Sequence, residues 1–373
     1  MTRPELPGPM RRRGPRPLML HLSHGMLKSP AFPPVSTPLS EGSPNWSLEQ
    51  RVDPALVAGI AAYRRHPWQR DLSDPPCIWR EGDSRLLDYG EGGPTILFVP
   101  SLVNRAYVLD LAAERSMLRW LGRRDVRPVL LDWGWPGPQE RRFTLTDYIA
   151  GRLSRAMAAL GGPVVLAGYC MGGLLALAAA LREPAMVRGL VLLATPWDFH
   201  ATKPAQAVAD LMRTVEPLLA TTGTLPIDAL QTLFGLQDAD GVAARYRAFA
   251  TQDSSTSRAR MFVALEDWLA DGVPLAAPVA RECLAGWYGA NTPGTGSWQV
   301  AGEIVDPAAL RVPAFVAVPH RDRIVPPGSA RPLAALIPGS YRLDPQAGHV
   351  GMVAGSQAEA VLWTPLLDWM RRL

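Results

Sequence analysis

The pattern that most constrains the fold of this chain is a series of short apolar runs separated by helical segments. Five runs have the length of buried strands and are followed by turn residues: 96–99, 129–131, 164–167, 190–193 and 315–318. Three segments with helical periodicity separate most of these runs: 107–121, 145–160 and 173–182. Strands that alternate with helices predict an α/β fold, with a mostly parallel sheet covered by helices on both faces.

Two further regions do not follow this alternation. Residues 1–46 are rich in Pro, Ser and Arg and predict a flexible extension with one short helix around 18–27, an amphipathic docking helix being the alternative. A helix is expected within 47–65, because Pro67 follows it, and irregular structure from there to residue 90. About 100 helix-rich residues, 200–300, interrupt the alternation and predict a cap inserted into a catalytic domain of residues 47–373.

Composition excludes several classes of protein. Of the 373 residues, 47% are hydrophobic and 19% are charged, which is enough to form a core. A net charge of +4 suits an anionic substrate and does not require nucleic acid. The three cysteines, Cys77, Cys170 and Cys283, exclude a disulfide framework and fit a reducing, cytoplasmic compartment. No apolar run approaches the roughly 20 residues of a membrane span, and we expect no signal peptide.

The stretch around Cys170 carries the strongest chemical signal. An apolar strand, the motif Gly-Tyr-Cys-Met-Gly at 168–172 and an Ala/Leu-rich helix follow one another, which is the context of a nucleophile elbow. Gly168 and Gly172 fit this sharp turn because only small residues are tolerated there. The helix N-terminus favours a thiolate at Cys170. The Met171 amide is one expected oxyanion donor, and a second is expected in the loop after the first strand, at Leu102 or Val103. The alternative is that Cys170 is only a small buried core residue.

Two partners for Cys170 follow in the expected order of nucleophile, acid and histidine. Asp322 lies in the loop after strand 315–318, and His349 lies between a strand-like piece at 340–343 and the last helix. Taken singly, Asp322 could be a turn carboxylate and His349 a loop histidine, but their joint order favours a triad. His320 is a weaker alternative base. No metal-ligand spacing, phosphate loop or dinucleotide motif occurs, so we expect neither a metal nor a cofactor.

Motifs along residues 95–355 resemble those of polyhydroxyalkanoate synthases. They are PSLVNRAYVLDL at 100–111, LDWGWPG at 131–137, DYI at 147–149, GYCMGG at 168–173, TPWDFH at 195–200, VAGEIVD at 300–306, DRIVPP at 322–327 and GHVG at 348–351. The resemblance implies an α/β-hydrolase fold with Cys170 as nucleophile, His349 as base and Asp322 as its partner. It departs from the family at Arg323, where a histidine is common after the acid. The chain has the size of the short catalytic subunits of this family.

The resemblance also implies a substrate and partners. The family polymerises (R)-3-hydroxyacyl-CoA in the cytoplasm, on the surface of polyester granules, and its short subunits work with a second subunit; a homodimer is also compatible. Trp133 and Trp135 follow a strand end and are candidates to line the acyl site. Arg105 and Arg323 are candidates to bind the CoA phosphates, with ordinary surface arginines as the alternative. The competing functions are hydrolysis of a thioester or ester by the same triad, and a non-catalytic granule-associated protein.

Overall fold

The computed structural model describes residues 12, 14–27, 53–201, 205–235 and 239–373. The chain forms two compact units, which we describe separately. The helical unit comprises Met1–Arg70 and Asp228–Asp271, and the sheet unit comprises Asp71–Ile227 and Gly272–Leu373. Most of residues 1–46, for which a flexible extension is predicted, and residues 47–52 of the first expected helix lie outside the described part of the chain.

The sheet unit is built on eight strands in the order β1-β2-β6-β3-β7-β8-β13-β14. Their bounds are β1 (Cys77–Glu81), β2 (Ser84–Asp88), β3 (Thr95–Val99), β6 (Arg127–Asp132), β7 (Val164–Tyr169), β8 (Val187–Leu193), β13 (Ala314–Ala317) and β14 (Tyr341–Leu343). All pairs from β6 to β14 are parallel, and β2 is antiparallel to both β6 and β1. The predicted α/β class with a mostly parallel sheet is confirmed.

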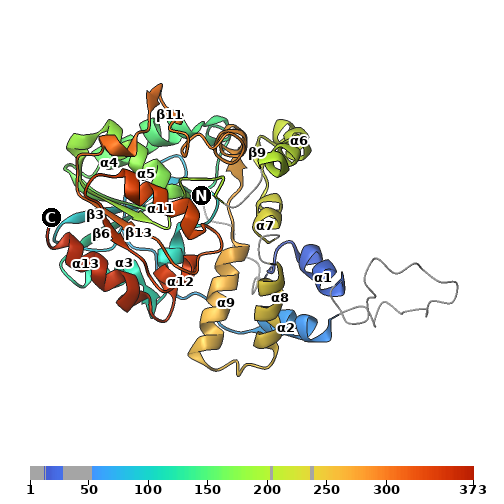
Figure 1. The fold of residues 1–373 in the computed structure, drawn as a ribbon. Coiled ribbons are helices and arrows are strands. Elements are labelled where there is room, and N and C mark those ends of the chain that lie inside the picture. The colour runs from blue at the N-terminus through green and yellow to red at the C-terminus, as the bar shows by residue number, and fades with distance from the viewer. Residues whose placement is uncertain (1–11, 13, 28–52, 202–204, 236–238) are drawn as a thin grey trace, which may run out of the picture. The chain divides into compact units, whose positions relative to one another are not determined.

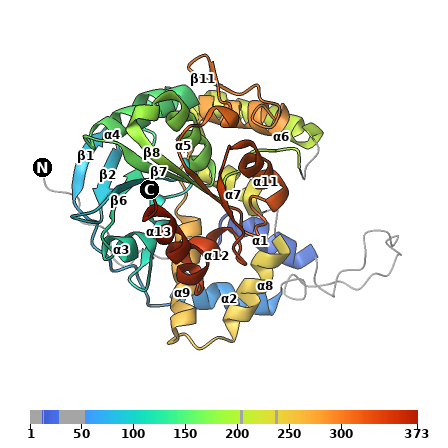
Figure 2. The same ribbon diagram turned by 60° about the vertical axis from the view of Figure 1, so that its left-hand side comes forward.

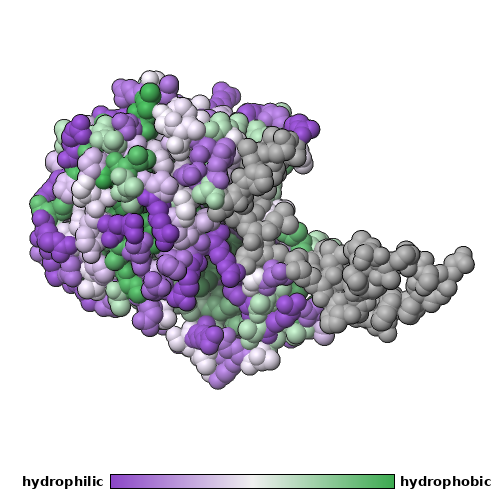
Figure 3. All heavy atoms as spheres, in the orientation of Figure 1, coloured by the Kyte–Doolittle hydropathy of each residue, from purple (hydrophilic) through white to green (hydrophobic). Residues whose placement is uncertain are grey.

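Helices cover both faces of this sheet (Figures 1 and 2). On one face lie α4 (Ser154–Ala158) and α5 (Met171–Arg182), and on the other lie α3 (Met117–Gly122) and α13 (Thr364–Met370). Every residue of β7 is buried, as expected for a central strand covered on both sides. On the face seen in Figure 3, hydrophilic and intermediate residues cover most of the sheet unit, with hydrophobic residues in small scattered areas. The apolar side chains of the strands are therefore spent on the interior.

Shorter elements complete the sheet unit. The short helical segments are η2 (Ala106–Leu109), η3 (Glu140–Arg142), η4 (Asp147–Leu153), η5 (Pro184–Met186), α6 (Ala205–Thr222), α10 (Ala277–Arg281), η6 (Glu282–Gly289), η7 (Pro307–Ala309), α11 (Pro327–Leu336), α12 (His349–Ala354) and η8 (Glu359–Trp363). The small strands are β4 (Asp110–Ala112), β5 (Arg115–Ser116), β9 (Thr224–Leu225), β10 (Leu275–Ala276), β11 (Gln299–Val300) and β12 (Glu303–Ile304).

Two expectations for this unit are wrong. The segment 107–121 is not one helix, because the β4–β5 hairpin interrupts it and only α3 is helical at its end. Asp110 explains the break: its carboxylate is fully buried and accepts hydrogen bonds from Arg119 at 2.8 and 3.0 Å, a contact that holds the hairpin against α3. Residues 66–90 are also not irregular throughout, since they contain the antiparallel pair β1–β2.

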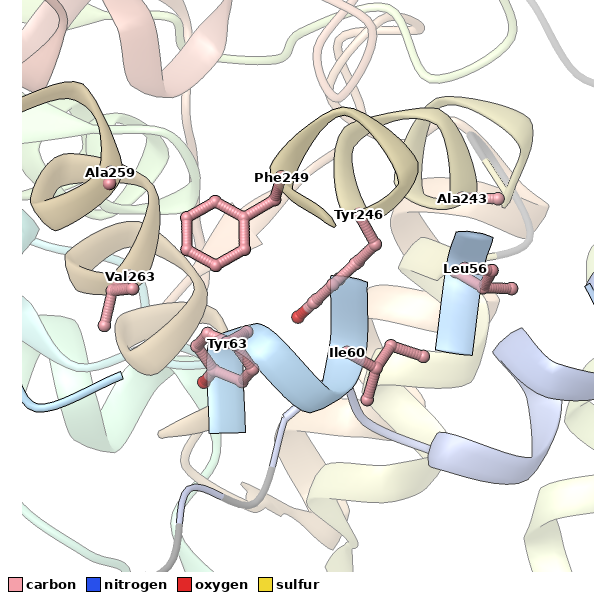
Figure 4. Packing of buried hydrophobic residues seen from close by; sticks show 8 residues of the cluster. All are labelled: Leu56, Ile60, Tyr63, Ala243, Tyr246, Phe249, Ala259 and Val263. Atoms are coloured by element: carbon pink, nitrogen blue, oxygen red, sulfur yellow. The ribbon is translucent and has the colours of Figure 1, made fainter. Parts of the chain in front are cut away.

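The helical unit consists of α1 (Leu18–Leu27), α2 (Pro54–Arg65), α7 (Ile227–Gly235), α8 (Ala239–Ala250) and α9 (Ser257–Ala270). The short helix expected around 18–27 is present as α1. Side chains of α2, α8 and α9 form its apolar core (Figure 4): Leu56, Ile60, Tyr63, Ala243, Tyr246, Phe249, Ala259 and Val263. Asp53 caps α2 by accepting hydrogen bonds from the amides of Ala55 and Leu56. Residues 200–300, for which a single cap is predicted, contribute to both units.

Candidate active site

Cys170 occupies a strained turn between the central strand and a buried helix. It separates β7, which ends at Tyr169, from α5, which begins at Met171. Its backbone has φ +57° and ψ −128°, a conformation that L-residues rarely adopt. The Cys170 amide donates to the Leu193 carbonyl at 2.8 Å, which fixes the turn to the end of β8. The turn projects the thiol from the carboxyl edge of the sheet, as the motif predicts.

The glycines around Cys170 are required by close backbone contacts. A Cβ on Gly168 would lie 2.3 Å from the Gly173 Cα, and one on Gly172 would lie 2.1 Å from the Val99 carbonyl oxygen. These distances leave no room for any side chain. Gly173, which the sequence analysis did not single out, is equally constrained, because its Cβ would lie 1.8 Å from Thr195 Oγ1. The third glycine of the motif could have been recognised as a packing requirement of the turn.

His349 and Asp322 form a direct buried pair. His349 begins α12, and its Nδ1 lies 2.6 Å from Asp322 Oδ2. The other carboxylate oxygen of Asp322 accepts hydrogen bonds from the Ile324 and Val325 amides at 2.8 and 2.9 Å. Asp322 is therefore fixed as an acceptor on both oxygens, and the Nδ1 contact leaves His349 Nε2 for a second partner.

That second partner is Cys170. Burial by itself lowers the pKa of His349, but the negative charges of Cys170 and Asp322 outweigh it and raise the pKa to about 10. The imidazole thus lies within the field of both the sulfur and the carboxylate, and it is stabilised as a cation between them. The three residues named from the sequence are brought together, in an arrangement that can hold a thiolate beside an imidazolium.

Tyr169 is a neighbour of the site that the sequence analysis missed. Its ring centroid lies 5.0 Å from that of His349, and its hydroxyl donates to the His349 carbonyl at 3.3 Å. Burial, together with the charges of Cys170 and Asp322, raises the pKa of Tyr169 well above its usual value, so the phenol stays neutral. Its position between Gly168 and Cys170 in the motif was the available signal.

The expected oxyanion donors lie at the ends of β3 and β7. Met171 is the first residue of α5, so its amide has no acceptor one turn earlier in the helix. Leu102 and Val103 follow β3, which is the strand next to β7. The Val103 amide donates to Ser101 Oγ at 3.3 Å, which makes the Leu102 amide the loop donor that we favour in the proposal below.

The remaining candidates have different surroundings. Trp133 is buried at 7% exposure; its indole donates to the Pro100 carbonyl at 3.0 Å and its ring contacts Tyr148. Trp135 is 46% exposed. Arg105 is half-buried and Arg323 is exposed, so their roles in binding CoA stay predictions. The His320 amide donates to the Pro345 carbonyl, and no contact between the His320 ring and Cys170 is present among the described residues.

Two searches of the described residues gave no match. Within residues 12, 14–27, 53–201, 205–235 and 239–373, no group of three His, Cys, Asp or Glu side chains is placed to hold a metal ion. In the same part of the chain, no helix is long and apolar enough to cross a membrane.

Comparison with known proteins gives a family and several relatives. Residues 94–355 match the model of the alpha/beta hydrolase fold family. The chain is 27% identical to the poly(3-hydroxyalkanoate) polymerase subunit PhaC of Haloferax mediterranei over 78% of this chain and 62% of that one. It is 28% identical to the subunit of the same name from Allochromatium vinosum, over 80% of this chain and 88% of that one.

A solved structure supports the fold. The thioesterase domain from the curacin biosynthetic pathway superposes with a TM-score of 0.52 at 16% sequence identity, over 80% of this chain and all of that domain. At this level of identity, the likeness concerns the fold alone.

Proposed function

The chain belongs to the α/β-hydrolase superfamily and, within it, to the polyhydroxyalkanoate synthase family, and we propose that it is an acyltransferase that polymerises (R)-3-hydroxyacyl-CoA. One observation carries the proposal: His349 lies between the Asp322 carboxylate and the Cys170 sulfur, at a strained turn of a chain related to polymerase subunits. Because the chain spans 62% of the Haloferax relative and 88% of the Allochromatium one, activity, substrate and partners are inferred and not transferred whole.

The first step loads the acyl group onto the enzyme. The Cys170 thiolate attacks the thioester carbonyl of the acyl-CoA, and the Met171 and Leu102 amides hydrogen-bond the resulting oxyanion. Collapse of this intermediate breaks the bond between carbon and the CoA sulfur, and the His349 imidazolium gives its proton to the departing thiolate. CoA leaves as a thiol, and a new thioester joins the acyl group to Cys170. The raised pKa of His349 supports this step, because it keeps the proton available for the leaving group.

The second step extends the polyester. The hydroxyl of another hydroxyacyl unit attacks the Cys170 thioester while His349 Nε2 accepts its proton. An ester forms, the bond to Cys170 breaks, and the imidazolium and thiolate are restored. Asp322 holds the imidazole in the tautomer that this exchange requires.

Cysteine suits this sequence better than serine. Exchange of one thioester for another changes the free energy little, so the acyl group on Cys170 remains activated for attack by a hydroxyl. A serine ester would lose that activation in the first step. A thiolate paired with an imidazolium is also strongly nucleophilic near neutral pH.

The remaining parts of the proposal concern location and partners. We place the reaction in the cytoplasm at a polyester granule surface, with a second synthase subunit or a second copy of the chain as its partner. Arg105, Arg323, Trp133 and Trp135 remain candidates for contacts with CoA and the acyl chain. Water has to be excluded from the Cys170 thioester, since hydrolysis competes with transfer.

The test is a reaction of the purified full-length chain with (R)-3-hydroxybutyryl-CoA, beside a Cys170→Ala variant. Release of CoA and the identity of the acyl product are measured together. The proposal expects polymer or oligomer from the wild type and none from the variant. Free hydroxy acid as the main product would instead identify a hydrolase on the same site, and CoA release that survives in Cys170→Ala would overturn the role of Cys170.

A further inference from the structure

Segment η6 brings a second tyrosine toward the Cys170 thiol. Tyr288 is half-buried near the end of η6, and its ring lies edge-on against Phe199, with the ring centroids 4.9 Å apart. Phe199 belongs to the loop that follows β8, the strand that accepts the Cys170 amide. Tyr288 therefore packs on a loop that leaves the sheet edge beside the nucleophile.

The electrostatics agree with this placement. Burial is the main cause that raises the pKa of Tyr288, and the charges of Cys170 and of the buried Cys283 add to it. The charge on the Cys170 sulfur thus acts on only two tyrosines among the described groups with a shifted pKa, Tyr288 and Tyr169. Both phenols remain protonated at neutral pH, so both are hydrogen-bond donors.

The two tyrosines differ in what they bind. The Tyr169 hydroxyl donates to the His349 carbonyl. The Tyr288 hydroxyl makes no hydrogen bond among the described residues and is not sealed from solvent. A neutral donor beside the nucleophile is thus free to bind a substrate atom.

A dedicated clasp fixes the segment that carries Tyr288. The Asn291 side chain accepts a hydrogen bond from the Phe199 amide and donates one to Asp198 Oδ1, each at 2.9 Å. His200 Nε2 lies 3.1 Å from the Tyr288 and Gly289 carbonyl oxygens. Asn291 is buried and holds φ +52°, an uncommon conformation that its two side-chain bonds stabilise. Such a rigid attachment is expected where a side chain must be positioned accurately.

The chemistry of the bound acyl group indicates what Tyr288 contacts. A hydroxyacyl group on Cys170 presents two oxygens near the sulfur, the carbonyl oxygen and the oxygen on the third carbon. In the proposed mechanism the carbonyl oxygen has the Met171 and Leu102 amides as donors, whereas the oxygen on the third carbon has none. We propose that Tyr288 is a specificity-determining residue whose hydroxyl donates a hydrogen bond to the oxygen on the third carbon of the acyl group, with Asn291 as its positioning residue. This inference rests on the proposed function.

The test is a single-turnover acylation of Cys170, followed by intact-mass spectrometry of the full-length chain. The two substrates are (R)-3-hydroxybutyryl-CoA and butyryl-CoA, which lacks the third-carbon oxygen. Tyr288→Phe is expected to slow acylation by the hydroxyacyl substrate about tenfold to a hundredfold and to leave the rate with butyryl-CoA unchanged. Tyr341→Phe, at an exposed tyrosine on the edge strand β14, is the control and should change neither rate.

A second variant separates position from fold. Asn291→Gly removes both side-chain bonds, and glycine adopts φ +52° without strain. It is expected to lower the preference for the hydroxyacyl substrate over butyryl-CoA, an effect that general loss of stability would not produce. Equal losses with both substrates, or no loss with either, in Tyr288→Phe would overturn the inference. A wild type that neither substrate acylates would refute the proposed function itself, and that result is read before any variant is compared.

Discussion

At the residue scale, the nucleophile position is chosen for chemistry against local stability. Cys170 holds φ +57° and ψ −128°, where a side chain costs on the order of 1–3 kcal/mol. Contacts at three glycines and the Leu193 carbonyl hold the turn in this conformation. The strained backbone points the thiol at His349, so the cost is tied to the proposed reaction and not to packing.

Replacement of Cys170 should therefore separate stability from function. We expect Cys170→Gly to be about 1 kcal/mol more stable than Cys170→Ala, because glycine relieves the positive φ while alanine keeps it. Both variants lose acyl transfer. Ala158→Gly, at an exposed position of α4, is the matched control and should lose roughly 0.5–1 kcal/mol. Urea unfolding of all three gives the comparison; a less stable Cys170→Gly would show that the turn is not strained.

The His349 pKa gives a prediction about Cys170 reactivity. A pKa of about 10 keeps the imidazolium beside the sulfur over the neutral range, so alkylation of Cys170 by iodoacetamide should be nearly constant from pH 6.5 to about 9. Asp322→Asn removes a charge that raises this pKa and turns an amide N–H toward Nδ1, which leaves Nε2 protonated and unable to take the thiol proton.

For Asp322→Asn we expect alkylation at pH 6.5 to fall by about tenfold or more and then to rise with pH, as for an ordinary thiol. Mass spectrometry of the Cys170 peptide measures it without interference from Cys77. Asp344→Asn, which breaks an exposed ion pair with Arg342, should leave the profile unchanged. A pH profile that is the same for wild type and Asp322→Asn would contradict the ion pair.

At the scale of single elements, close approach of α2 and α8 depends on one glycine. A Cβ on Gly59 would lie 1.8 Å from the Tyr246 carbonyl oxygen, which is backbone and does not move independently of α8. Gly59→Ala should destabilise the helical unit by about 2–3 kcal/mol. Gly162→Ala, where no atom lies within 4 Å of the new Cβ, should change stability by less than about 0.5 kcal/mol. Hydrogen exchange in α2 and α8 reports the difference, and equal protection in both variants would argue against the tight contact.

The sequence predicted the elements whose signal is local. The five buried strands, α1 and the turn at Cys170 were accessible, because apolar runs, Gly spacing and turn residues are read within a few positions. The β4–β5 hairpin was not, because the contact that breaks the expected helix joins Asp110 to Arg119 and depends on tertiary burial. Tyr288 was missed for the same reason, since 118 residues separate it from Cys170 and no motif links them.

At the scale of the whole molecule, the chain crosses between two units, and the N-terminal part belongs to one of them. Arg12 binds Asp267 at 3.0 Å and the carbonyl oxygens of His66 and Trp68, all within the helical unit. Its side chain is 11% exposed and lies over the Tyr63 ring. A basic residue in a Pro-rich segment is therefore a structural anchor, which composition alone did not indicate.

Loss of this anchor should weaken the helical unit in a pH-dependent way. Arg12→Ala should cost about 1–3 kcal/mol, because Asp267 and two carbonyls lose a buried donor. Burial raises the pKa of Asp267 and Arg12 opposes that rise, so without Arg12 the folded unit binds a proton more tightly than the unfolded chain does. Stability then falls as the pH rises through the raised pKa, and the deficit should be larger at pH 7 than at pH 4.5.

Hydrogen exchange in α2 and α9 at the two pH values measures this deficit, with the known pH dependence of intrinsic exchange taken into account. Arg16→Ala is the matched control: Arg16 pairs with Asp228 at 2.9 Å, but that carboxylate is 58% exposed, so its loss should cost less than about 1 kcal/mol at either pH. Strands β7 and β8 belong to the other unit and should keep their protection in both variants. If Arg12→Ala and Arg16→Ala behaved alike, the N-terminal segment would be a surface attachment and not part of the core of this unit.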